Sequence, residues 1–273
     1  MKALSVVLIA TSLFIINSCN STSADKTATE QKQSDPANIV KQSFYMQYKT
    51  GANEIEAGKV VTLYFTPRIK GRESEPVALE SGHGKKVNLM IVSDDLSQFY
   101  QLWPEYQADG SYTADFTFPT GGKYEHILVY KPSSNNGEKV TENIPLTVKG
   151  KDYIAARFNE TKLTDETEDG YSVTLNVKEG DWKVNSKMRI EGMGKKNGSE
   201  VNASAFDTYQ DGKANMVILK MDNKEYDHSH SDAVNGRFDF QHTFKQPGRY
   251  RAFLQFKVGG KIYTTDFTFN VKY

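Results

Sequence analysis

Two histidines with the spacing of one strand face are the residues best suited to do chemistry in this chain. The stretch EYDHSHSD, residues 225–232, places His228 and His230 between aspartates in a chain with five histidines. Residues i and i+2 of a β-strand point to the same face with Cα atoms about 7 Å apart, so two imidazoles here can converge on one ion. Imidazole suits zinc and copper, and a thioether such as Met221 favours copper(I). Two histidines are an incomplete ligand set, so His242, a methionine or a carboxylate has to supply a third donor.

The same stretch has a second interpretation, as a solvated turn between strands. Ser and Asp are common turn residues, and a histidine on an apolar strand face, as His242 is in GRFDFQHTF, is more often a satisfied core residue than a ligand. The residues leave two alternatives: a copper or zinc site built from His228, His230, His242 and Met221, and a solvated turn without metal.

The strands that would position these histidines recur in two copies. Residues 87–148 and 214–271 share one order: an apolar strand, an Asp-rich turn, a short aromatic strand, a Gly turn and three further strands. Further strand-like stretches precede the two copies at 44–50, 59–69, 153–158, 171–180 and 187–193. Each half thus holds about seven short strands, as Ig-like sandwiches do. We predict an all-β chain of two tandem Ig-like β-sandwich domains, residues 42–150 and 151–273.

Alternation along these strands predicts which side chains lie inward. In the second copy Phe238, Phe240, His242 and Phe244 share one face. The segments 118–124 and 244–250 look like the same strand-turn-strand corner, in which Pro and Gly set the turn dihedrals. Trp103 and Trp182 could stack on a sugar, but single aromatic residues in β-proteins are more often core.

The N-terminal residues predict export and lipidation. An apolar run of signal-peptide length follows Met-Lys and ends in INSC, whose Cys19 is the only cysteine. This resembles a bacterial lipoprotein signal, which implies cleavage before Cys19 and acylation of that cysteine; an ordinary secretory signal is the alternative. Residues 1–18 are then a lipoprotein signal peptide, and the polar residues 19–41 are a disordered tether. Asn20 resembles the residue found in lipoproteins sorted to the outer membrane, so we expect a lipid-anchored protein of the cell envelope, on its periplasmic or surface face.

Composition excludes several classes of function. The 34 basic and 34 acidic residues give a formal net charge of zero, which does not favour nucleic acid as a partner. With its one cysteine in the lipidation position, the chain has no thiol for a disulfide, a thiolate metal ligand or a cysteine nucleophile. No GxSxG, HExxH, Walker or dinucleotide motif is present, so we expect no enzyme activity.

The two copies are similar to a family of small bacterial extracytoplasmic β-sandwich domains, YtkA-like in style and associated with copper handling. The first copy matches its scaffold in VSDDL, residues 92–96, and in the corner FPTGGKY, residues 118–124. The family's histidines are missing there, because Asn88 stands on the strand and QLWP, residues 101–104, replaces His-x-His-Pro. The second copy keeps His228-Ser229-His230.

This resemblance implies a membrane-anchored extracytoplasmic binding lipoprotein whose second domain binds or buffers copper or zinc, while the first domain is a structural copy. The alternative is a structural or protein-interaction lipoprotein of the cell envelope that has another envelope protein as its partner and no metal site. The missing histidines of the first copy support that alternative.

Overall fold

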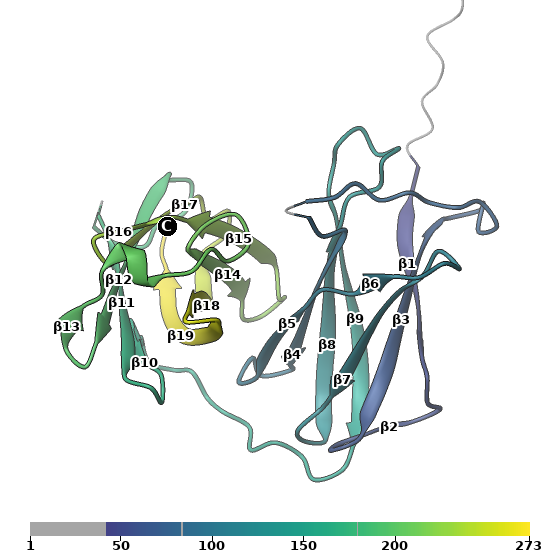
Figure 1. Cartoon of the computed structure of the whole chain (residues 1–273), viewed down its shortest axis with the longest axis horizontal. Helices are drawn as coiled ribbons and strands as arrows, with labels where there is room; N and C mark the ends of the chain where they lie inside the picture. The colour runs from purple at the N-terminus through teal and green to yellow at the C-terminus, as the bar shows by residue number, and fades with distance from the viewer. Residues whose placement is uncertain (1–41, 83, 179) are drawn as a thin grey trace, which may run out of the picture. The chain divides into compact units, whose positions relative to one another are not determined.

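The computed structural model describes residues 42–82, 84–178 and 180–273, which form two tandem Ig-like β-sandwiches (Figure 1). The predicted all-β fold class is confirmed. The predicted signal peptide and tether, with Cys19, lie outside the described residues, as does His83. Within the described residues we find no helix with the length and hydrophobicity that a bilayer crossing requires.

In the described residues nine strands build the first sandwich and ten build the second. The first contains β1 (Phe44–Thr50), β2 (Ile55–Glu56), β3 (Val60–Ile69), β4 (Val87–Ser93), β5 (Phe99–Leu102), β6 (Glu105–Tyr106), β7 (Tyr112–Thr117), β8 (Gly122–Tyr130) and β9 (Val140–Lys149). The second contains β10 (Thr164–Glu166), β11 (Tyr171–Val177), β12 (Met188–Lys196), β13 (Ser199–Glu200), β14 (Ala214–Lys220), β15 (Tyr226–Ser231), β16 (Ala233–Val234), β17 (Arg237–His242), β18 (Gly248–Val258) and β19 (Lys261–Val271). A short 3₁₀ turn, η1 (Ala203–Ala205), precedes β14.

The two sandwiches repeat one strand order. In the first, one sheet runs β1-β3-β7-β6 and the other β2-β9-β8-β4-β5. In the second, one sheet runs β10-β11-β12-β17-β16 and the other β15-β14-β18-β19, with β13 paired to β12. Thus β4 and β5 correspond to β14 and β15, and β8 and β9 to β18 and β19, as the internal repeat predicts.

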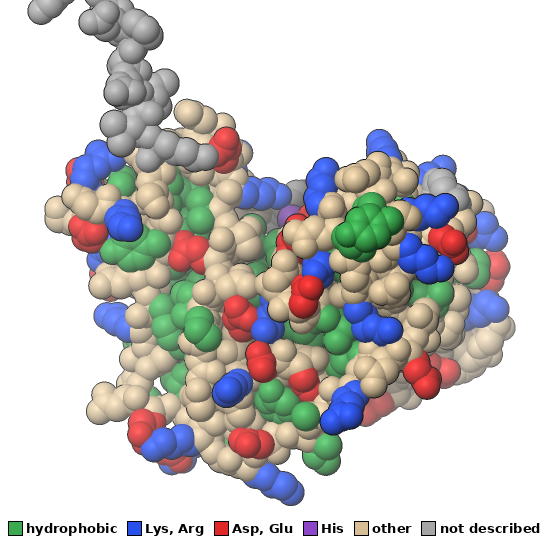
Figure 2. All heavy atoms as spheres, turned by 180° about the vertical axis from the view of Figure 1, so that it is seen from behind, with side chains coloured by type: hydrophobic (Ala, Val, Ile, Leu, Met, Phe, Trp, Pro, Cys, Tyr) green, Lys and Arg blue, Asp and Glu red, His purple; other side chains and the backbone are tan. Residues whose placement is uncertain are grey.

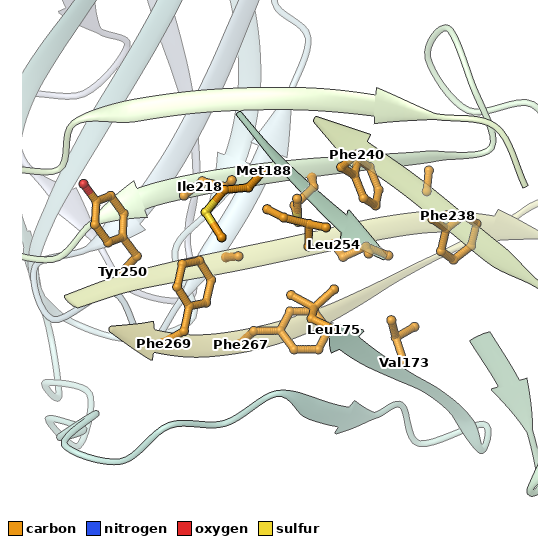
Figure 3. Packing of buried hydrophobic residues seen from close by; sticks show 14 of the residues in the cluster. Val173, Leu175, Met188, Ile218, Phe238, Phe240, Tyr250, Leu254, Phe267 and Phe269 are labelled. Carbon is orange, nitrogen blue, oxygen red and sulfur yellow. The ribbon is translucent and has the colours of Figure 1, made fainter. Parts of the chain in front are cut away.

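Alternating burial explains why these segments are strands. Along β3 every second residue is buried, and Phe238 and Phe240 of β17 are fully buried while their neighbours are exposed. Figure 3 shows the resulting core of the second sandwich, where Phe240 and Leu175 from one sheet pack toward Leu254 and Phe269 from the other. Burying one apolar face of each sheet removes these side chains from water and stabilises the two-layer arrangement.

The predicted corner is present in both copies. Gly122 and Gly248 have φ of +122° and +134°, a conformation that glycine tolerates because it lacks Cβ. Two residues later a tyrosine hydroxyl donates back to a backbone carbonyl: Tyr124 to Thr120 at 3.2 Å and Tyr250 to Gln246 at 2.8 Å. This arrangement resembles the tyrosine corner of Ig-like folds and closes the same turn twice.

The predicted strand at 153–158 is wrong, because this segment pairs with no other strand. Its backbone N–H and C=O groups instead form separate hydrogen bonds with side chains. The Ala156 N–H donates to a carboxylate oxygen of Asp95 at 2.7 Å, and the Phe158 carbonyl accepts a hydrogen bond from Arg249 at 2.8 Å. Residues 153–158, which connect the two sandwiches, are therefore hydrogen-bonded to both sandwiches. Residues 42–273 form one compact unit.

Candidate functional site at the junction of the two sandwiches

Strands β14 and β15 position the two histidines. Their antiparallel register sets His228 opposite Val217 and His230 opposite Asn215. Directly opposed residues share a face of the sheet, so both imidazoles lie on the face that carries Val217. Their ring centroids are 5.2 Å apart and their planes are nearly perpendicular. The structure therefore brings His228 and His230 together, as the i, i+2 spacing predicted.

That face of the second sandwich packs on the corresponding face of the first. The apolar residues of this contact, here called the interface cluster, are Met90, Val92, Leu96, Ile127, Val129, Val217, Leu219 and Phe253. Phe99 stacks on Phe253 with ring centroids 4.3 Å apart. Met90 and Val217 occupy corresponding positions in the two copies, as do Ile127 and Phe253. The contact therefore has the self-complementary character of a two-fold dimer interface, within a single chain.

Hydrogen-bonded amides extend this contact. Gln101 Nε2 donates to Asn88 Oδ1 at 2.9 Å, and Gln101 Oε1 accepts from Asn215 Nδ2 at 3.3 Å. Gln210 Nε2 also donates to Gln101 Oε1 at 3.3 Å, and Asn88 Nδ2 donates to the Tyr226 hydroxyl at 3.4 Å. Asn88 and Asn215 stand at corresponding strand positions. Gln101 thus bridges Asn88 of its own copy and Asn215 of the other copy. Within the described residues Asn215 Oδ1 is buried without a hydrogen-bond partner.

A pocket of about 90 Å³ opens beside these amides, and we call it the junction pocket. Its lining includes Asn88 and Trp103 from the first sandwich and Gln210, His228 and His230 from the second. Trp103 and His230 are corresponding residues of the two repeats. One pocket is therefore lined by Trp103, which belongs to the segment that replaces the histidine motif in the first copy, and by the two histidines of the second copy.

Charge is distributed unevenly around the junction pocket. Lys85, Lys86, Lys131 and Lys139 line it together with one acidic residue, Glu80, which forms an ion pair with Lys131. The formal excess is three positive charges in a chain of zero net charge. On the face drawn in Figure 2, by comparison, basic and acidic side chains are interspersed. The pocket is therefore a locally cationic site.

His242 lies away from the other two histidines. Asp227 stands opposite Ile218, whose side chain belongs to the core of the second sandwich, so Asp227 and His228 point to opposite faces of β15. His242 Nδ1 lies 2.8 Å from Asp227 Oδ2. Burial raises the pKa of Asp227, but hydrogen bonds from His242 and from the His228 N–H outweigh it, and the net shift is downward. The structure thus couples His242 to Asp227 and does not bring it to the junction pocket.

The remaining predicted ligand is Met221, which packs against the interface cluster. Within the described part of the chain no three His, Cys, Asp or Glu side chains gather closely enough to hold a metal ion. His228 and His230 are thus a pair of possible donors in the junction pocket. The predicted copper or zinc site remains a prediction.

Sequence reasoning missed the junction itself, although one signal for it was present. Strands β4 and β14 are buried along almost their whole length. A sheet with one face in water alternates apolar and polar residues, whereas a sheet covered on both faces is continuously apolar. The runs VNLMIV and ANMVIL therefore indicate that the outer faces of these sheets are covered. Only the structure shows that they cover each other.

Residues 165–273, which span most of the second sandwich and less than half of the chain, match the family described as Domain of unknown function (DUF8832). No curated protein matches the chain.

Solved structures show a general likeness. A mutant α-2-macroglobulin from Salmonella is 12% identical over 85% of this chain and 15% of its own, with a TM-score of 0.27. The Escherichia coli adhesin FdeC is 14% identical over 84% of this chain and 64% of its own, also with a TM-score of 0.27. The D0-D1 domain of intimin is 10% identical over 83% of this chain and 99% of its own, with a TM-score of 0.23. This chain thus spans a small part of the macroglobulin.

Proposed function

We propose that this protein is a lipid-anchored, extracytoplasmic binding module without catalytic activity, and that the junction pocket is its binding site. The observation that carries the proposal is the convergence of corresponding segments of the two repeats on one pocket, with Trp103 from the first copy and His230 from the second. Cys19 holds the chain to the membrane, and the resemblance to YtkA-like domains supports a place in the cell envelope.

The first ligand we propose is a copper or zinc ion held by His228 and His230. Their rings are 5.2 Å apart and line the same pocket, and imidazole is a ligand for both metals. Amide oxygens of the pocket or ligands from solvent would complete the coordination shell.

A metal titration tests this form of the proposal. The protein, residues 40–273 purified without a histidine tag, carries Trp182→Phe so that Trp103 is its single tryptophan and reports from the pocket wall. We expect Cu²⁺ to quench Trp103 fluorescence saturably at one equivalent. The double variant His228→Ala/His230→Ala should bind at least tenfold more weakly.

His242→Ala is the matched control. It also removes one imidazole, but on the opposite face of β15, so copper binding should not change. Negligible binding of both metals by the parent protein, or equal losses in the His242 variant and the double variant, would contradict the proposed site.

The second candidate is a structural or protein-interaction lipoprotein that presents the two sandwiches as one body. It is favoured by the interface cluster, which joins the sandwiches through their sheet faces. This candidate becomes the working description if the metal titration fails.

A further inference from the structure

The lysines at the rim of the junction pocket have no role in the proposed metal site of His228 and His230. Lys85, Lys86 and Lys139 are exposed at the pocket, whereas Lys131 is already paired with Glu80. Ammonium groups at the rim attract an anion. The local charge therefore favours an anionic ligand.

Trp103 supplies an aromatic wall in the same pocket. The two tryptophans of the chain have different environments. Trp182 stacks on Phe269 with ring centroids 3.8 Å apart and packs against the core of the second sandwich. Trp103 follows β5 directly and lines the junction pocket, half-buried. An indole at a pocket wall offers a large flat apolar surface for a ring, next to polar partners.

The amides of the pocket have hydrogen-bonding capacity left. A carboxamide offers two N–H donors and two lone pairs. Asn88 uses one lone pair for Gln101 and one N–H for Tyr226, and Gln210 uses one N–H for Gln101. Asn88 thus has one N–H and one lone pair to spare, whereas Gln210, which also bonds the Tyr209 hydroxyl, offers its carbonyl oxygen. Hydroxyl groups both donate and accept, so a polyhydroxylated ring suits these amides better than an aromatic acid does.

We propose that the junction pocket binds an acidic sugar, with its ring on Trp103, its hydroxyls on Asn88 and Gln210, and its carboxylate or sulfate at Lys85, Lys86 and Lys139. The pocket volume of about 90 Å³ fits a single terminal sugar unit entering partway from the rim rather than an enclosed oligosaccharide. This inference shares the pocket with the proposed function but needs no metal.

Fluorescence of Trp103 tests the proposal in the Trp182→Phe protein, residues 40–273, kept metal-free with EDTA. The probes are glucuronate, glucose as its neutral counterpart, and sodium sulfate as an anion without a ring. We expect a saturable change with glucuronate and at least tenfold weaker responses to glucose and to sulfate. Raising NaCl to 0.5 M should weaken glucuronate binding, because salt screens exposed charges.

Lysine variants locate the site. Lys85→Gln/Lys139→Gln should weaken glucuronate binding at least tenfold. The control Lys70→Gln/Lys151→Gln removes two exposed lysines outside the pocket lining and should stay within twofold of the parent. Four outcomes would each overturn the acidic-sugar site. Two concern the probes: glucose or sulfate binds as well as glucuronate. The other two are equal effects of the two lysine pairs and the lack of a saturable response to glucuronate. The sugar titration is done without metal. Its result therefore tests the acidic-sugar site independently of the copper titration.

Discussion

The two sandwiches share one strand order but place their inward-facing histidines in opposite environments. In the first, His126 of β8 is fully buried beside Tyr48 and Phe65, and among the described residues neither ring nitrogen has a hydrogen-bond partner. Ala252 occupies the corresponding position in the second, where the inward-facing histidine is His242, paired with Asp227. One imidazole therefore serves as an apolar ring and the other as a polar partner. The comparison teaches that surroundings decide the role of a histidine in this repeat.

A second difference concerns charge at one register position. Glu125 of β8 forms an ion pair with Lys224 across the junction at 3.1 Å. The corresponding Arg251 of β18 is buried, donates to Asp266 at 2.9 Å and lies over the ring of Phe158. In the first copy the residue at this position thus contacts the second sandwich, whereas in the second copy it contacts Phe158 of the connecting segment.

The largest expected loss of stability comes from substitutions in the interface cluster, where the two sandwiches pack on each other. Phe253→Ala removes the ring stacked on Phe99 and should lower the free energy of unfolding of residues 40–273 by about 3–5 kcal/mol. The corresponding Ile127→Ala should cost about 2–4 kcal/mol. Urea unfolding measures both, with Val60→Ala, at an exposed position, as the control. Losses below about 1 kcal/mol for Phe253→Ala would mean that the interface is not packed in solution.

The second prediction uses the acid sensitivity of His126. Burial lowers its pKa to about 3 from 6.5, so between these values the unfolded chain binds a proton that the folded chain excludes. Stability then falls as the pH drops below about 6.5, by about 1.4 kcal/mol per pH unit, or roughly 3 kcal/mol at pH 4.5.

His126→Leu isolates this contribution. At pH 7 the variant should lie within about 1.5 kcal/mol of the parent, since a ring without hydrogen bonds is replaced by an apolar side chain of similar size. Between pH 7 and pH 4.5 the difference in unfolding free energy between variant and parent should grow in favour of the variant. If both lose stability equally over this range, His126 is not the neutral buried group described above.

The smallest expected effect is at the charged position. Glu125→Gln should lower stability by about 1 kcal/mol or less, because Lys224 keeps Asp94 at 3.0 Å as its partner. Arg251→Met should cost more, because the guanidinium is buried and the variant loses its hydrogen bonds to Asp266 and Thr268 and its contact with the Phe158 ring. Chemical denaturation of both variants side by side measures the difference, and a reversed order would show that the two positions are not used as we describe.

The candidate site was only partly predictable. The i, i+2 spacing of His228 and His230 was sufficient to place them on one face, because strand geometry is local. The inward face of Phe238, Phe240 and His242 followed from the same rule. The proposed partnership of His242 with the histidine pair did not follow, because strand pairing, rather than distance along the chain, sets which face of β15 it meets.

The sequence alone determined the all-β class, the repeat, the corners and the strand faces of this protein, because alternation and turn chemistry act within a few residues. The tertiary structure decided which sheet faces meet, that residues 153–158 connect the sandwiches without forming a strand, and that Trp103 lines a pocket with His228 and His230. These outcomes depend on contacts between residues far apart in the chain, such as Gln101 with Asn215 and Ala156 with Asp95. Such contacts are selected by the packing of two complete sheets, and no local pattern encodes them.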